Sequence, residues 1–86
     1  MADKINLTVS TADGGNFQKS VSYVNIPTDF GSLGILSGHA PMVCQVAKGR
    51  LKFRFDGDEQ GSVIVGSGIA TVGDNEVLLL VNELQY

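Results

Sequence analysis

The sequence has too few of several residue types to build the common kinds of catalytic or metal centre. Its 86 residues include one cysteine, one histidine and no tryptophan. One cysteine excludes a disulfide within the chain and is typical of a reducing compartment. A zinc site needs three or four protein ligands, and one cysteine with one histidine falls short of that number. We therefore expect no metal, no cofactor and no catalytic residues.

Positive charge and long apolar runs are also scarce. Six lysines and arginines stand against nine acids, which gives a net charge of −3 and argues against a nucleic-acid partner. The longest apolar run, Val77 to Val81, is far shorter than the roughly 20 residues that span a membrane. The N-terminus lacks the basic and apolar regions of a signal peptide. These shortages predict a soluble domain and leave an association with a membrane complex open.

Glycine and alternating patterns are what the sequence has in abundance. Eleven glycines in a chain of one-domain length, 1–86, predict many turns. Apolar and polar residues alternate between them with the period of half-buried strands. We expect about eight strands, at a spacing typical of an all-β sandwich or barrel with mostly antiparallel strands. They span residues 5–10, 19–26, 33–36, 42–46, 50–55, 62–66, 69–72 and 76–81.

Two strand boundaries are predicted from single features. Pro27 should end the second strand, because proline lacks the backbone donor that a central strand needs. The last residues, from Asn82 to Tyr86, have the composition to begin a helix but no room to continue it.

A basic stripe runs along the clearest strand. Lys48, Arg50, Lys52 and Arg54 are four of the six cations and alternate with apolar residues, so they should point to one side about 6.6–7 Å apart. Like charges this close repel one another. Two interpretations are open: an edge strand that uses charge to prevent aggregation, or a contact surface for an acidic partner.

The glycine-rich loops do not match nucleotide or calcium motifs. A phosphate-binding P-loop needs a Gly-Lys pair, which this sequence lacks, and Gly66-Ser67-Gly68 is not followed by a third glycine at the required spacing. Asp56-Gly57-Asp58 is similar to the start of a calcium loop, but Ser67 stands where the bidentate glutamate is needed. A solvated hairpin turn is the better interpretation of residues 56–61.

The single histidine lies in the stretch "GSLGILSGHAPMV", from Gly31 to Val43. A nucleophile needs a base beside it, and an alternating strand would place Cys44 on the opposite face from His39. We therefore expect His39 to be a turn residue whose ring hydrogen-bonds the backbone or packs at the surface.

The spacing within this stretch resembles a known family. The motif Gly31-x-x-Gly34-Ile35-Leu36-x-Gly38-His39-Ala40-Pro41 is similar to the hallmark of the epsilon subunit of rotary F-type ATP synthases, called delta in mitochondria. "INLTVSTADG", "VSYVNIPTDFGSLGIL", "KGRLKFRF" and "VGSGIATVGDNEVLLLV" resemble the other strands of that family in register. The resemblance covers essentially the whole chain.

The resemblance implies a fold, partners and a place. The fold would be the family's N-terminal β-sandwich domain, of about ten short strands. The subunit would be a non-catalytic part of the central stalk that fastens the gamma subunit to the c-ring, so that ion-driven rotation is coupled to ATP synthesis. It would lie on the cytoplasmic face of the bacterial inner membrane as a peripheral subunit, with an organellar equivalent left open.

Particular residues follow from matching motif positions. Thr11, His39 and Cys44 match positions on or near the gamma-facing side. The c-ring-facing loop would be Asp29, Phe30, Gly31, Ser32 and Leu33. Many members carry an acid at the position of Ser32, facing a polar loop of the c subunit, and Asp29 is the candidate to replace it. Ser37 stands in place of a common proline.

Family members usually continue into a C-terminal helical hairpin, which binds ATP and inhibits hydrolysis in some bacteria. This sequence stops at Tyr86, where the hairpin would begin, so we expect neither property in this chain. Two other classes of function stay open. A free-standing β-sandwich adaptor or ligand-binding module would carry a concave pocket, and a small enzyme would need a reactive pair that the sequence does not supply.

Overall fold

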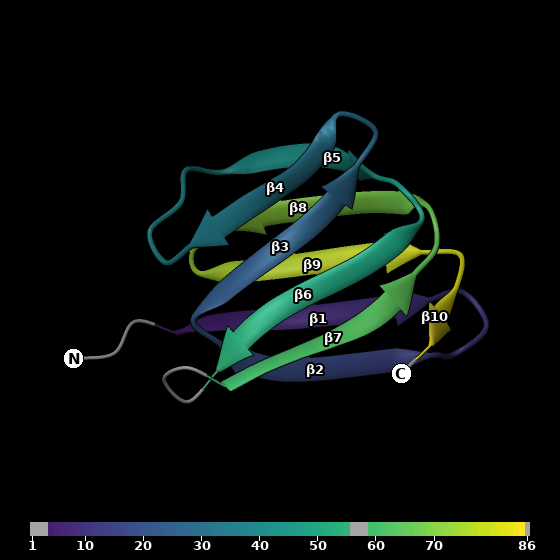
Figure 1. The fold of residues 1–86 in the computed structure, drawn as a ribbon, viewed down its shortest axis with the longest axis horizontal. Coiled ribbons are helices and arrows are strands. Elements are labelled where there is room, and N and C mark those ends of the chain that lie inside the picture. The colour runs from purple at the N-terminus through teal and green to yellow at the C-terminus, as the bar shows by residue number, and fades with distance from the viewer. Residues whose placement is uncertain (1–3, 56–58, 86) are drawn as a thin grey trace.

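The computed structural model, which describes residues 4–55 and 59–85, has two β-sheets packed face to face (Figure 1). The predicted all-β sandwich is confirmed, with the ten strands that the family resemblance implied rather than the eight of the pattern. They are β1 (Ile5–Thr11), β2 (Asn16–Val21), β3 (Tyr23–Thr28), β4 (Gly31–Leu36), β5 (Met42–Val46), β6 (Gly49–Phe55), β7 (Glu59–Val65), β8 (Gly68–Gly73), β9 (Glu76–Val81) and β10 (Leu84–Gln85).

Each sheet has five strands. Sheet A has the order β2-β1-β9-β8-β5, and sheet B has the order β10-β7-β6-β3-β4. Among the described residues, every strand pairing is antiparallel except that of β1 with β9, which run side by side in the same direction. The two predicted hairpins, β6–β7 and β8–β9, are confirmed. Residues 56–58, where the calcium-like motif falls, lie outside the described residues.

The core lies between the sheets and is built by the alternation that the sequence shows. Inward residues of neighbouring strands meet in register, so that Leu7 stands opposite Val77 and Ala70 opposite Leu79. Each buried aliphatic side chain contributes roughly 1.5–3 kcal/mol relative to exposure. The buried side chains are Ile5, Leu7, Val9, Val21, Val24, Ile26, Ile35, Val46, Leu51, Phe53, Val63, Val65, Ala70, Val72, Val77, Leu79 and Val81.

The predicted single strand over 19–26 is wrong. The chain leaves sheet A after Val21 and enters sheet B at Tyr23, so the segment contributes to two strands in two sheets. Ser22 makes the corner, where its backbone N–H donates to the carbonyl of Arg54 at 2.8 Å. The alternation changes phase at this corner: the inward position before it is Val21, whereas the inward positions after it are Val24 and Ile26.

Pro27 does not end its strand, contrary to prediction. It lies within β3, opposite Ser32 of β4. The register of β3 with β6 covers only Tyr23 to Asn25, so no ladder bond to β6 is lost at Pro27. Its carbonyl accepts a hydrogen bond from the backbone N–H of Ala47 at 3.0 Å.

The C-terminal residues form a strand and not the start of a helix. Leu84 and Gln85 pair with Val65 and Ile64 of β7, which extends sheet B by one short strand. A strand of two residues is too short for an alternating pattern to be recognised in the sequence.

Two sheet-to-sheet links lie against each other near the C-terminal end. One joins β7 to β8 through Gly66 and Ser67, and the other joins β9 to β10 through Asn82 and Glu83. Gly66 N–H donates to the carbonyl of Glu83 at 2.9 Å, and Asn82 N–H donates to that of Ser67 at 3.0 Å. Gly66 and Gly68 permit this close packing, because an added Cβ would overlap the side chain of Asn82 at Gly66 and the backbone of Leu80 at Gly68.

Candidate functional site

The motif loop between β4 and β5 is held by the turn between β8 and β9. The backbone N–H of Gly38 donates to Oδ1 of Asn75 at 2.8 Å, and the Ser37 hydroxyl donates to the same oxygen at 3.2 Å. Gly38 has a φ of +83°, which a side chain would disfavour. The loop is therefore shaped by one glycine and one amide oxygen.

His39 hydrogen-bonds the backbone, as predicted. Its backbone N–H donates to the carbonyl of Leu36 at 3.2 Å, and its Nδ1 lies 2.7 Å from the carbonyl of Ala40. Pro41 precedes β5 and lies beside Gly73 of β8. Within residues 4–55 and 59–85, no group of three His, Cys, Asp or Glu side chains could hold a metal ion.

We expect Asn75→Ala to lower the free energy of unfolding by about 1–3 kcal/mol, measured by urea denaturation. The change removes the acceptor of two hydrogen bonds and places alanine at a φ of 58°, where asparagine is better tolerated. Asn75→Asp keeps an acceptor oxygen and should retain most of the stability. An equal loss in both variants would show that the amide oxygen does not hold the loop.

Thr11 is engaged within the turn between β1 and β2. Its hydroxyl oxygen accepts the N–H of Gly15 at 2.8 Å and its hydroxyl donates to the carboxylate of Asp13. This hydroxyl, helped by the backbone N–H of Gly15, lowers the pKa of Asp13 below its usual value. The residue thus fixes the geometry of a turn at the opposite end of sheet A from His39.

Cys44 lies on β5, at the open edge of sheet A. It pairs with Ala70, which is fully buried, so its side chain shares the inner face of the sheet. Its partial burial raises the pKa of the thiol. The structure therefore does not bring Thr11, His39 and Cys44 together at one point.

The outer face of sheet A carries an apolar surface that the sequence analysis missed. Ile69 stands opposite Leu80, and both are about half exposed, while Val43 of the neighbouring strand is 70% exposed. Together with the half-buried Leu78, these residues form what we call the apolar face. The available signal was the unbroken run from Val77 to Val81, because a strand with one wet face should alternate.

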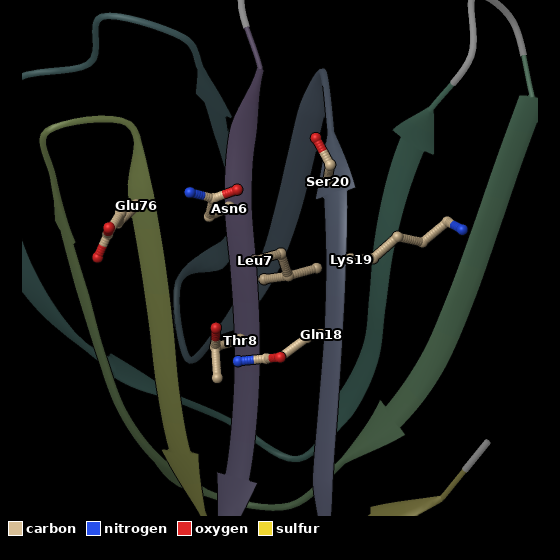
Figure 2. Close-up of a pocket in the computed structure, with 7 residues that line it drawn as sticks. All are labelled: Asn6, Leu7, Thr8, Gln18, Lys19, Ser20 and Glu76. Atoms are coloured by element: carbon tan, nitrogen blue, oxygen red, sulfur yellow. The ribbon is translucent and has the colours of Figure 1, made fainter.

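A polar depression borders the apolar face over β1 and β2 (Figure 2). Asn6, Thr8, Gln18, Ser20 and Glu76 surround it. Figure 2 shows the Lys19 side chain extending away from this group, and its ammonium lies 4.0 Å from the ring centroid of Phe55. The depression is open, and its lining offers hydrogen-bonding side chains together with the carboxylate of Glu76.

The loop between β3 and β4 is a tight turn that presents one aromatic side chain. Thr28 Oγ1 accepts the backbone N–H of Phe30 at 3.2 Å, and its hydroxyl donates to the carbonyl of Gly31 at 2.7 Å. Gly31 has a φ of +115°, which favours glycine. Phe30 is fully exposed at the tip. Leu33 and Cys44 help to line a pocket beside it.

The basic stripe is not at a sheet edge, so the edge-strand interpretation is wrong. β6 lies inside sheet B, between β7 and β3. Arg50, Lys52 and Arg54 are exposed on the outer face of that sheet, whereas Lys48 precedes the strand. The pattern showed a strand with one charged side, but strand order depends on pairings that alternation does not record.

The fold is a β-sandwich of two five-stranded sheets, with an apolar group on the outer face of sheet A and a hydrogen-bonded turn that carries an exposed aromatic. The family model described as the ATP synthase Delta/Epsilon chain β-sandwich domain matches residues 4–85. The chain belongs to this family, which confirms the resemblance stated from the motif.

Curated relatives and a solved structure support the same family. The chain is 33% identical over 81 residues to the chloroplastic ATP synthase epsilon chain of Coffea arabica, covering 94% of this chain and 61% of that one. It is 34% identical over 80 residues to the ATP synthase epsilon chain of Maridesulfovibrio salexigens, covering 93% and 56%. A chain of the Euglena gracilis mitochondrial ATP synthase structure (OSCP/F1/c-ring) matches with a TM-score of 0.84 and 30% identity, covering 94% and 52%.

The chain thus spans about three fifths or less of the length of these relatives. Among the residues described, there is no helix long and apolar enough to cross a membrane.

Proposed function

We propose that the chain is a non-catalytic rotor subunit of an F-type ATP synthase, which links the gamma subunit to the c-ring so that ion-driven rotation is coupled to ATP synthesis. Its membership of the Delta/Epsilon family supports this role. The observation that carries the proposal is the apolar face, because exposed apolar side chains gathered on one sheet mark a protein interface. The subunit would be peripheral, on the cytoplasmic face of a bacterial inner membrane or its organellar equivalent.

The gamma subunit would cover the apolar face. Val43, Ile69 and Leu80 project from neighbouring strands of a rigid sheet, so binding would order few additional groups. His39 and Thr11 border this face at its two ends, and Cys44 lies at its open β5 edge. His39 and Thr11 would contact gamma at the rim of the interface, where polar residues are usual. Cys44, whose side chain is on the inner face, would contact gamma only where gamma extends past the β5 edge.

The c-ring would contact the turn between β3 and β4. Asp29 and Phe30 are exposed at its tip, and Ser32 and Leu33 follow on the edge strand β4. Asp29 would supply the negative charge that many relatives carry at the position of Ser32. Phe30 would supply an apolar anchor on a turn whose backbone is already fixed by Thr28 and Gly31.

We expect Phe30→Ala to weaken attachment to the c-ring about 10-fold or more without altering the free energy of unfolding beyond about 0.5 kcal/mol. A fully exposed side chain contributes little to folding, whereas an aromatic anchor at an interface contributes strongly to binding. Co-purification of the ring with gamma and this chain, over increasing salt, measures the attachment. Phe30→Tyr is the matched control and should stay attached.

The proposed function is tested by co-expressing the chain with the gamma and c subunits of its own organism. The expected result is a complex that contains all three. A chain that keeps its fold, shown by circular dichroism and cooperative unfolding, but binds neither subunit would contradict the proposal. That outcome would favour the free-standing adaptor.

A further inference from the structure

A basic face covers the outer side of sheet B, opposite the apolar face of sheet A. We define it by Arg50, Lys52 and Arg54, which are exposed at alternate positions of β6. Alternate strand residues lie about 6.6–7 Å apart on the same side. Because β6 is an interior strand flanked by β3 and β7, these cations stand in the middle of a sheet and not along its edge.

The neighbours of these cations position them without neutralising them. The guanidinium of Arg54 lies 4.7 Å from the ring centroid of Tyr23, and Nη1 of Arg50 donates to the Ser62 hydroxyl at 3.1 Å. Lys52 stands between Asn25 of β3 and Ser62 of β7. All of these neighbours are uncharged, so the side chains are oriented while their charge stays available.

No acid among the described residues stands at a strand position paired with Arg50, Lys52 or Arg54. The described acids lie in turns or at strand ends: Asp13, Asp29, Glu59, Asp74, Glu76 and Glu83. A chain with a net charge of −3 therefore places half of its cations on one sheet face, with uncharged residues at the paired positions of the neighbouring strands.

We propose that the basic face docks an acidic α-helix of a partner protein, lying along β6. Because β6 has a neighbouring strand on each side, a partner cannot add a strand to it. A partner can only cover its outer face, as helices or a second sheet do. Carboxylates at positions i, i+4 and i+8 of a helix rise about 6 Å per step, close to the spacing of the three cations. Arginine and lysine side chains are long enough to absorb the remaining mismatch.

The polar groups between the cations fit the same occupant. Asn25, Gln60 and Ser62 lie in the shallow hollows beside Lys52 and Arg54, where they can hydrogen-bond glutamate side chains. The basic face and the apolar face belong to different sheets. A helix docked here would therefore leave the proposed gamma surface free, and the inference does not depend on the proposed function.

The test uses a designed helical peptide with glutamates at i, i+4 and i+8, and a peptide of the same composition with the glutamates spread around the helix. Binding to the isotope-labelled chain is followed by NMR at low salt. We expect shifts at the backbone amides of β3, β6 and β7, an affinity at least 10-fold higher for the striped peptide, and loss of binding as salt rises.

Variants decide whether the three cations carry the binding. Lys52→Gln should weaken binding of the striped peptide about 5-fold or more, and the triple variant Arg50→Gln, Lys52→Gln, Arg54→Gln should abolish it. Lys48→Gln removes the same charge just outside the face and should bind normally. Thermal unfolding of each variant checks that the fold is kept.

Three results would overturn the inference. The two peptides could bind equally, Lys48→Gln could weaken binding as much as Lys52→Gln, or vesicles containing anionic lipid could bind more tightly than the striped peptide. Either of the first two results would show that the basic face attracts acidic peptides without regard to their structure. The third would show that the face binds a membrane surface.

Discussion

Gly68→Ala is expected to lower the free energy of unfolding by about 3 kcal/mol or more, with urea denaturation as the measurement. A Cβ atom at this position would lie 1.9 Å from the carbonyl oxygen of Leu80 and 2.7 Å from the Cα of Val81. Both are backbone atoms of the neighbouring strand β9, so no side-chain rotation relieves the overlap. The strands must move apart, and overpacking of this kind is costly even when side chains can adjust.

The matched control is Gly73→Ala, at the other end of β8. The nearest atom to an added Cβ there is Cβ of Pro41, at 3.8 Å, which is an ordinary contact. This variant should unfold within about 1 kcal/mol of the original chain, since alanine also lowers the entropy of the unfolded state. If the two substitutions had equal effects, the close approach of β8 and β9 at Gly68 would not limit the size of residue 68.

Alternation and turn residues were enough to predict the class of fold. The strand from Arg50 to Phe55 shows why: Leu51 and Phe53 are buried and the basic residues between them are exposed, as a period of two requires. What alternation does not record is the strand's neighbours. The corner at Ser22 and the interior place of β6 both depend on pairing between distant segments. The sequence therefore predicted one long strand over 19–26 and left an edge position open for 50–55.

The functional surface was harder to predict from the sequence than the fold. The motif containing Gly38 and His39 identified the family because its spacing is specific, yet the structure shows those residues shaping a loop through Asn75. The apolar face arises only when β5, β8 and β9 are placed side by side, since Val43, Ile69 and Leu80 are far apart in the sequence. Their exposure could not be inferred without the order of the sheet.

Leu80→Glu is the substitution expected to affect assembly most. Leu80 is 55% exposed on β9, in the middle of sheet A, where its side chain would be covered by gamma. A carboxylate there would have to lose its water without a partner charge, which is costly in an apolar interface. We expect the affinity for gamma to fall about 100-fold or more, measured by titration of gamma with the purified chain.

Leu36→Glu is the control that separates the two faces. Leu36 is 60% exposed, and its substitution replaces the same side chain by the same carboxylate. Leu36 stands opposite Tyr23, however, on the outer side of sheet B. Both variants should unfold within about 1 kcal/mol of the original chain, because neither position is buried. Loss of gamma binding in Leu80→Glu alone would assign the interface to sheet A. Loss in Leu36→Glu alone would assign it to sheet B and contradict the proposed orientation on the stalk.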